Sequence, residues 1–130
     1  MAIRYLSVAD MIALHTQTME RMGERPASVR DPALLESAVL RPQMAAYYEE
    51  ADLERQAALL AVGISQNQPF IDGNKRAAYI ALVTFLRVNG RSFAGDPMDL
   101  ARELEAVVTH LDSLEAATYR FEQWLRGHTG

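Results

Sequence analysis

One nine-residue segment of the chain, residues 68–76, combines residue types that could bind an anion. It reads Gln-Pro-Phe-Ile-Asp-Gly-Asn-Lys-Arg, and an apolar segment of helical length follows it directly. Gly73 permits backbone conformations closed to other residues, and a helix beginning at Asn74 would turn unpaired N–H groups and its positive dipole end towards the segment. Lys75 and Arg76 in the first turn oppose that dipole. An anionic ligand would remove this conflict.

Asp72 adds a carboxylate to the same segment. Proteins usually bind Mg²⁺ through one or two carboxylates together with the phosphates of a substrate. The pattern therefore indicates a site for a nucleotide polyphosphate. As isolated features, the same residues also fit a solvated Lys-Arg pair after an Asp-Gly-Asn turn. The spacing alone leaves both interpretations open.

The elements that must position this segment are helices. Capping residues, prolines and glycines divide the chain into six helical segments, with no internal repeat and no linker long enough to separate domains, so we expect one domain over residues 1–130. The predicted helices run from Ser7 as N-cap to a stop at Gly23, from Asp31-Pro32 to before Pro42, from about Asp52 to Asn67, from about Asn74 to Asn89, from Asp96-Pro97 with an apolar face reaching Leu111, and from Ser113 as N-cap to Gly127.

The fourth predicted helix has almost no polar face, and we expect it to be the central helix of the fold. Two segments have strand-like composition, Ile3–Leu6 and Arg91–Phe93, but they are long enough only for a minor β ribbon. The predicted class is therefore all-α.

Composition excludes several classes of protein. The chain has 130 residues, 49% of them hydrophobic, with no cysteine and a formal net charge of −4. It can therefore bury a core, but it cannot form disulfides or bind a metal through thiolates. The acidic balance argues against direct binding of nucleic acid. The longest apolar run, Ala77 to Leu86, is too short to span a membrane, and the N-terminus lacks the pattern of a secretory signal, so we expect a cytoplasmic protein.

Segment 68–76 and the apolar helix after it, which ends in Phe85-Leu86-Arg87-Val88-Asn89-Gly90, resemble the Fic/Doc superfamily and within it the Doc (death-on-curing) branch. The motif of that branch reads His-x-Phe-x-Asp-(Ala/Gly)-Asn-Lys-Arg. The resemblance extends to Leu14-His15, Arg41-Pro42-Gln43 and Tyr48-Glu49-Glu50, and so covers nearly the whole chain. It implies a compact six-helix fold in which the motif loop and the central helix form a nucleotide site.

The resemblance also implies roles for residues of the motif. Phe70 would pack into the core and orient the loop, Asp72 would bind Mg²⁺, and the phosphates of ATP would be bound by Gly73, Asn74, Lys75 and Arg76. Doc proteins phosphorylate a threonine of elongation factor Tu and so arrest translation. A Phd-like antitoxin, whose partly disordered tail folds on the toxin, holds them inactive.

Three positions depart from the patterns of this superfamily. Fic adenylyl transferases have Gly where this chain has Lys75, and a second Arg where it has Tyr79, which favours phosphoryl transfer by analogy with Doc. Gln68 stands where the family has the histidine that takes the proton from the attacking hydroxyl, and an amide is far too weak a base for that task. An engineered His→Gln change is the favoured explanation, and a naturally degenerate member or a member with another role are the alternatives. The competing functions are a catalytically silent module that binds nucleotide or antitoxin, and an adenylyl transferase.

Other polar and aromatic residues allow more than one interpretation. His15 lies on the apolar face of the first helix, where a hydrogen-bonded, partly buried histidine is the expectation and a catalytic role the alternative. The acidic run at residues 49–54 fits a solvated helix start or a surface for a basic partner. Tyr47 and Tyr48 could belong to the core or line a substrate groove.

Overall fold

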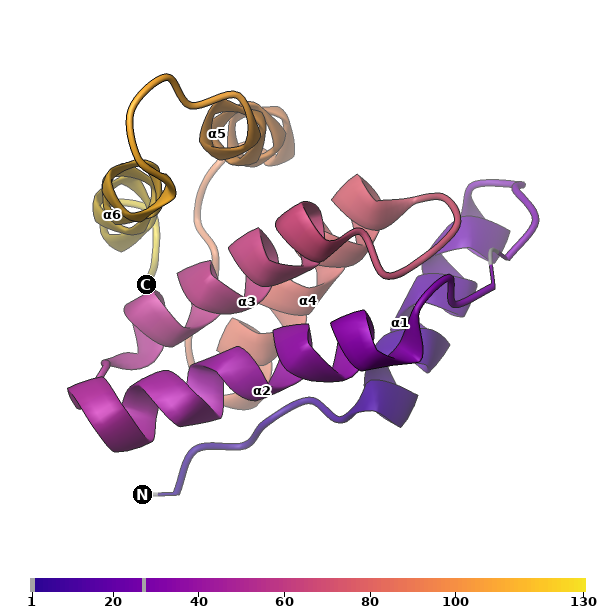
Figure 1. Cartoon of the computed structure of the whole chain (residues 1–130), viewed down its shortest axis with the longest axis horizontal. Coiled ribbons are helices and arrows are strands. Elements are labelled where there is room, and N and C mark those ends of the chain that lie inside the picture. Colours follow the sequence, from indigo (N-terminus) through magenta and orange to yellow (C-terminus); the bar gives the residue numbers. More distant parts are fainter. Residues whose placement is uncertain (1, 27) are drawn as a thin grey trace.

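The computed structural model describes residues 2–26 and 28–130, which fold into six α-helices (Figure 1). In chain order these are α1 (Val8–Arg21), α2 (Pro32–Glu49), α3 (Leu53–Asn67), α4 (Asn74–Val88), α5 (Pro97–Val108) and α6 (Leu114–Arg126). The described residues contain no β-strand, only two isolated bridges, Val29 with Phe70 and Phe93 with Thr129. The all-α class is confirmed, and Ile3–Leu6 does not pair as a strand. No helix in the described ranges is both long and apolar enough to cross a membrane.

Side-chain caps start five of the six helices. Each capping oxygen accepts a hydrogen bond from a backbone N–H of the first turn, which satisfies part of the unpaired helix terminus. These caps are Ser7, Asp31, Asp52, Asp96 and Ser113, all at the predicted positions. The exception is α4, which begins after Gly73 with no side-chain cap. The backbone N–H groups in the first turn of α4 therefore have no capping side chain.

α2 is longer than predicted, because it continues through Pro42 to Glu49 instead of ending before the proline. Proline inside a helix lacks the N–H that would bond to the carbonyl four residues back, which costs about 3 kcal/mol. α2 nevertheless stays helical because its buried face packs closely along α3, both before and after Pro42. The two helices are in direct contact at Gly63 of α3, where a Cβ would lie 3.1 Å from Arg41 Cδ and 3.5 Å from the Ala38 Cα. The burial offsets the lost hydrogen bond.

α3 and α4 together form the centre of the molecule. α4 packs against α1 and α3, as expected of a central apolar helix. α3 is still more enclosed, with α2 on one side and the α5–α6 pair on another (Figure 1), and eleven of its residues are buried. The sequence did not indicate that α3 is so enclosed, because some of its buried residues are polar. Gln56, for example, is fully buried because its amide accepts from the Tyr5 hydroxyl at 2.9 Å and donates to the Ala51 carbonyl at 2.9 Å.

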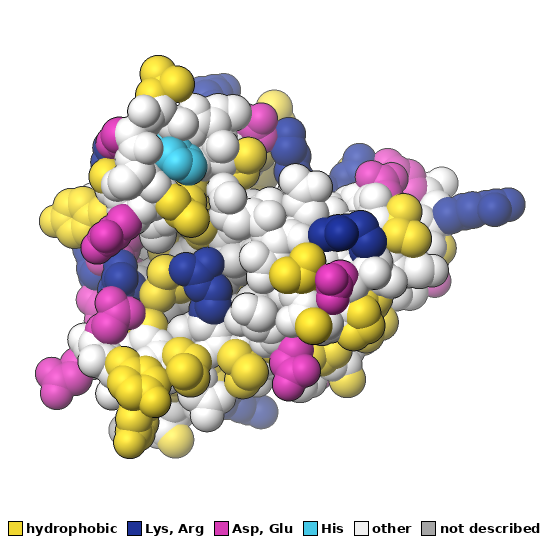
Figure 2. All heavy atoms as spheres, viewed as in Figure 1, with side chains coloured by type: hydrophobic (Ala, Val, Ile, Leu, Met, Phe, Trp, Pro, Cys, Tyr) yellow, Lys and Arg dark blue, Asp and Glu magenta, His cyan; other side chains and the backbone are white. Residues whose placement is uncertain are grey.

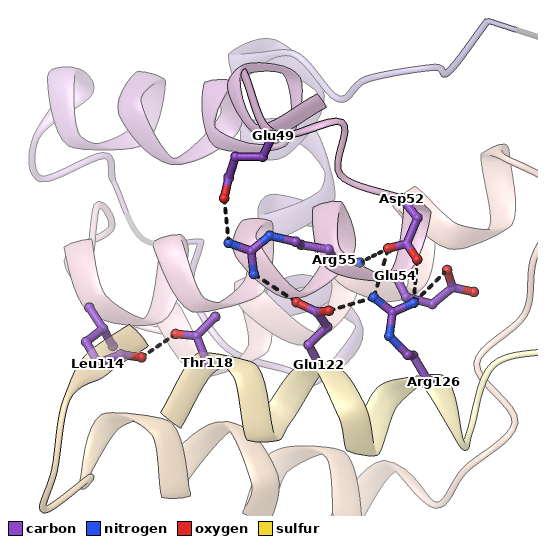
Figure 3. Close-up of polar contacts among 8 residues, drawn as sticks. All are labelled: Glu49, Asp52, Glu54, Arg55, Leu114, Thr118, Glu122 and Arg126. Carbon is purple, nitrogen blue, oxygen red and sulfur yellow. Dashed lines mark hydrogen bonds and ion pairs between the residues drawn. The ribbon is translucent and has the colours of Figure 1, made fainter. Parts of the chain in front are cut away.

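An ion-pair network ties α6 to the start of α3 and the end of α2 (Figure 3). Arg55 donates to Glu49 and to Glu122, both at 2.9 Å. Arg126 donates to Asp52 and, at 2.6 Å, to Glu122, whose carboxylate is buried. The hydrogen bond from Arg126 holds the pKa of Asp52 below its ordinary value. The network thus fixes α6 against the start of α3, the end of α3 remote from the candidate site.

The acidic run at residues 49–54 begins α3, as one of the two interpretations expected, with Asp52 as the N-cap and Glu54 in the first turn, but three of its acids are also paired within the chain. Glu49 and Asp52 are paired as just described, and Glu54 is buried and paired with Arg91. Their charges are matched within the chain.

The second half of α2, from Leu40 onwards, carries an exposed apolar surface, visible as the yellow row along α2 in Figure 2. The row comprises Leu40, Met44, Tyr47 and Tyr48, which we call the α2 row. The two tyrosines are 79% and 70% exposed and pack edge to face, so they do not belong to the core. Arg41 lies half-buried beside the row, and among the described residues it makes no ion pair. Burial, with the nearby charge of Arg55, lowers the pKa of Arg41.

Candidate functional site

The loop between α3 and α4, residues 68–73, forms one wall of a cavity of about 570 Å³. All six predicted site residues line this cavity, together with four that the sequence did not single out. The lining residues are Glu24, Ser65, Gln68, Ile71, Asp72, Gly73, Asn74, Lys75, Arg76 and Val108. The additional residues follow α1 or lie on α3, the loop and α5, so that only the packing of these elements brings the set together.

Gln68 ends α3 in a left-handed conformation with a φ of 46°, and its exposed side chain borders the cavity. Residues with a Cβ seldom adopt this φ, so the conformation needs support from outside the helix. Arg30, before α2, supplies it: its Nε donates to the Gln68 carbonyl and its Nη2 to the Asn67 carbonyl, both at 2.9 Å. Sequence reasoning missed Arg30, because nothing local connects it to a loop 38 residues away.

Two further contacts brace the middle of the loop. Val29 forms an antiparallel bridge with Phe70, and the N–H of Ile71 donates to the Ser28 carbonyl at 3.0 Å. Asn74 closes the loop from the other end, because its Oδ1 accepts from the Phe70 N–H at 3.0 Å and its Nδ2 donates to the Phe70 carbonyl at 2.9 Å. The Asn74 amide is thus engaged by the loop, and what this residue offers a ligand is its backbone N–H.

Asp72 and Gly73 lie where the loop meets the start of α4. The Asp72 side chain is exposed to the cavity, and its Oδ1 accepts from the Gly73 N–H at 2.8 Å. Gly73 has a φ of 76°, which is why glycine is required there. An exposed carboxylate therefore stands next to a helix N-terminus that has no side-chain cap.

His15 supports the loop from the core side. Its buried ring stacks on Phe70 with a centroid separation of 3.9 Å, and its Nε2 lies 3.0 Å from the Asp72 carbonyl oxygen. A carbonyl only accepts, so Nε2 carries the proton and donates. Burial lowers the pKa of His15, and its buried Nδ1 has no hydrogen-bond partner among the described residues. The expectation of a buried, hydrogen-bonded histidine is confirmed, and His15 does not line the cavity.

The two cations in the first turn of α4, Lys75 and Arg76, form ion pairs with acidic side chains. Lys75 Nζ lies 2.7 Å from Glu105 Oε2, and Arg76 pairs with Glu24, which itself lines the cavity. All four side chains are at least one third exposed, and such pairs contribute only about 0–1 kcal/mol each. An anionic ligand with several charges can therefore displace both carboxylates.

The donor set of the cavity fits a metal ion that arrives with phosphates. Among the described residues, no three side chains of His, Asp or Glu gather closely enough to hold a metal together. Asp72 and Glu24 are the carboxylates that line the cavity, and Glu24 is paired with Arg76. Mg²⁺ commonly takes one or two carboxylates and completes its octahedron with phosphates and water. Asp72 beside the start of α4 meets this requirement.

Comparison with known proteins identifies the family of this chain. The sequence profile of the Fic/DOC family matches residues 5–86, and the chain belongs to that family. Within the family it is a Doc protein. It is 40% identical over 95 residues to Toxin Doc of Mycolicibacterium smegmatis, an alignment covering 68% of this chain and 73% of that one. It is 36% identical over 89 residues to Protein kinase doc of Escherichia phage P1, covering 68% and 70% of the two chains.

Proposed function

We propose that this chain is the toxin of a toxin–antitoxin system and that its cavity is built to transfer a phosphoryl group from Mg²⁺-bound ATP to a threonine of elongation factor Tu. The observation that carries the proposal is the grouping in one cavity of an uncapped helix N-terminus, an exposed carboxylate and two cations. The names of the two relatives, a toxin and a protein kinase, support it. Modifying a translation factor in this way would arrest translation.

Each part of the cavity has a role in this proposal. Asp72 would hold Mg²⁺, which neutralises charge on the phosphates when bound. The N–H groups at the start of α4, with Lys75 and Arg76, would bind the phosphate oxygens. Phosphoryl transfer depends mainly on positioning and charge neutralisation, with little covalent chemistry for the protein. A pre-shaped loop with these groups supplies both.

Gln68 determines how fast the unmodified chain would transfer a phosphoryl group. A side chain at this position borders the cavity and could reach an attacking hydroxyl, but an amide cannot accept its proton. Loss of a general base typically lowers a rate by about 10²–10⁴-fold. The other elements of the site are in place, which supports a working site whose histidine was replaced. We therefore propose that this Gln68 form is strongly impaired.

Phosphoryl transfer is preferred to adenylyl transfer because of two positions. Lys75 occupies the position of a glycine in Fic adenylyl transferases, and Tyr79 that of an arginine. Tyr79 is half-buried and packs against the core without lining the cavity. The second phosphate-binding arginine of the adenylyl transferases thus has no counterpart at this position.

Restoring the base tests the proposal. Gln68→His is expected to arrest bacterial growth and to label elongation factor Tu from γ-labelled ATP, whereas Gln68→His combined with Asp72→Asn should do neither. Label arriving from α-labelled ATP instead would identify adenylyl transfer. A harmless histidine form that transfers no label would refute the kinase assignment.

A catalytically silent binding module is the second candidate, and Gln68 is the observation that favours it. Calorimetry of the unmodified chain with Mg·ATP and with a Phd-like antitoxin peptide separates the two. Growth arrest caused by the unmodified Gln68 chain, without any phosphoryl transfer, would favour the silent module.

The proposal also requires a surface for a Phd-like antitoxin, and we propose the α2 row for it. The row is exposed, apolar and spaced along one face of a helix, as a surface for an amphipathic segment should be. Arg41 beside it forms no ion pair with any described residue, unlike Arg55 and Arg126 in the network of Figure 3. A carboxylate on the antitoxin segment would complement Arg41.

A further inference from the structure

The peptide group between Asp72 and Gly73 is held from the core side by a single side chain. The braces described above hold the loop at Asn67 to Ile71, through residues 28–30 and through Asn74. None of these contacts reaches the carbonyl of Asp72. Among the described residues, the hydrogen bond to that oxygen comes from Nε2 of His15, at 3.0 Å.

The orientation of this peptide decides where the N–H of Gly73 points. All peptide bonds of the described residues are trans, so the carbonyl and the N–H of one peptide group point in opposite directions. With the carbonyl drawn towards the buried ring of His15, the Gly73 N–H must face the other way, towards the Asp72 carboxylate at the cavity. If the peptide flipped, the carbonyl oxygen would face the cavity and repel an anion.

His15 also controls the space under the turn. A Cβ added at Gly73 would lie 2.8 Å from His15 Nε2 and 2.8 Å from Met19 Sδ, so the glycine sits directly on these two α1 side chains. The His15 ring stacks on Phe70, the anchor of the same loop. One side chain therefore contacts the loop at three positions: Phe70, Asp72 and Gly73.

We propose that His15 is a positioning residue of the candidate site, and that its Nε2–H, by holding the Asp72 carbonyl on the core side, keeps the Gly73 N–H and the Asp72 carboxylate directed at the cavity. The peptide geometry stands on its own; only the identity of the ligand, an anionic polyphosphate, rests on the proposed function. His15 acts through the loop and does not touch the ligand.

The chemical state of His15 agrees with this role. An Nε2–H tautomer leaves Nδ1 as an unprotonated nitrogen, and in the part of the chain that the structure describes Nδ1 is buried without a partner. Protonation would place a second N–H in a site that offers no acceptor. The Nε2–H tautomer therefore makes the contact to Asp72 without leaving a buried donor unpaired.

Two substitutions separate the hydrogen bond from the packing. His15→Gln retains an N–H donor that can reach the Asp72 carbonyl, and His15→Leu fills the site without a donor. Met11→Ala is the matched control, because Met11 is another fully buried residue of α1, and among the described residues its side chain makes no hydrogen bond to the loop. Its truncation weakens the packing of α1 without removing a hydrogen bond from the loop.

The first measurement needs no ligand. Long-range ¹H–¹⁵N correlation spectra should show His15 as the Nε2–H tautomer, with His110 and His128 of the same chain as references. The Gly73 amide resonance should shift in His15→Leu and stay near its position in His15→Gln and Met11→Ala. An Nδ1–H tautomer, or a Gly73 amide unaffected by His15→Leu, would overturn the proposal whatever the chain binds.

The second measurement is calorimetric titration with Mg²⁺ and a non-hydrolysable ATP analogue. Losing one well-placed donor corresponds to about a tenfold loss of affinity in His15→Leu, with little change in His15→Gln and Met11→Ala. Equal losses in His15→Leu and Met11→Ala would show a merely structural role and overturn the proposal. If the unmodified chain bound no analogue while the amide spectra behaved as expected, the proposed function would fail and the positioning role would stand.

Discussion

The Asn74 side chain makes two hydrogen bonds to the Phe70 backbone: it accepts from the N–H at 3.0 Å and donates to the carbonyl at 2.9 Å. This reciprocal pair closes the loop segment between Phe70 and Asn74, the residue at which α4 begins. It also changes the expected role of Asn74: its side chain shapes the loop, and its phosphate contact would come from the backbone.

Asn74→Ala should therefore lower the stability of the protein. Two backbone groups of Phe70, which is buried, would lose their partner, at a cost of about 1–3 kcal/mol in the free energy of unfolding. Asn74→Asp keeps the acceptor but not the donor, so its stability should lie between those of the parent chain and Asn74→Ala. Denaturation in urea measures the difference. If both variants were as stable as the parent chain, the closed loop would contribute nothing.

Asp72→Asn should remove metal-dependent nucleotide binding and leave the fold intact. The Asp72 side chain is exposed, and an amide oxygen can still accept from the Gly73 N–H, so we expect little change in stability. Mn²⁺ relaxation or calorimetry with ATP measures the binding. Glu115→Gln, an exposed acid outside the cavity, is the control for loss of charge alone. Unchanged Mn²⁺-dependent binding in Asp72→Asn would place the metal elsewhere.

Protonation of His15 should make the protein less stable in mild acid. Burial lowers the pKa of His15 below its ordinary 6.5, so between the two values the unfolded chain binds a proton that the folded chain does not. The free energy of unfolding must then fall as pH falls below about 6.5 and level off below the folded pKa. Urea denaturation at several pH values checks this. The contribution should vanish in the His15→Gln variant, and identical pH profiles for the two proteins would contradict it.

Met44→Asp should weaken antitoxin binding without affecting the site. Met44 is 52% exposed in the middle of the α2 row, so a carboxylate there costs little stability but would place charge against an apolar segment and near Arg41. Calorimetry with a Phd-like antitoxin is expected to show a loss of tenfold or more, about 1.4 kcal/mol. Met98→Asp on α5, 69% exposed, is the matched control. Equal affinities for both variants would exclude the α2 row.

Local signals predicted most of the helix boundaries. Ser7, Asp31, Asp52, Asp96 and Ser113 stand at the predicted helix starts and cap these helices, because capping depends on hydrogen bonds within one turn. The prediction that α2 ends before Pro42 was wrong because it, too, relied only on a local preference. The local preference against proline was outweighed by the packing of α2 on α3 at Gly63, a contact between residues far apart in the chain.

The candidate site divides in the same way. The nine contiguous residues 68–76 already carry the carboxylate, the glycine and the two cations, so their chemistry was visible in the sequence. What braces them was not: Arg30 holds the end of α3, and His15 holds the Asp72 carbonyl. Each contact joins elements with no common local pattern.

The sequence by itself thus determined the helical class, the helix starts and the chemical groups available for an anion and a metal ion, since these depend on residue type and short spacing. Only the tertiary structure decided which way those groups face. That direction depends on one trans peptide between Asp72 and Gly73, whose carbonyl is bound by a histidine 57 residues earlier in the chain. Contacts over such a separation arise from the packing of whole helices, and no pattern of neighbouring residues encodes them.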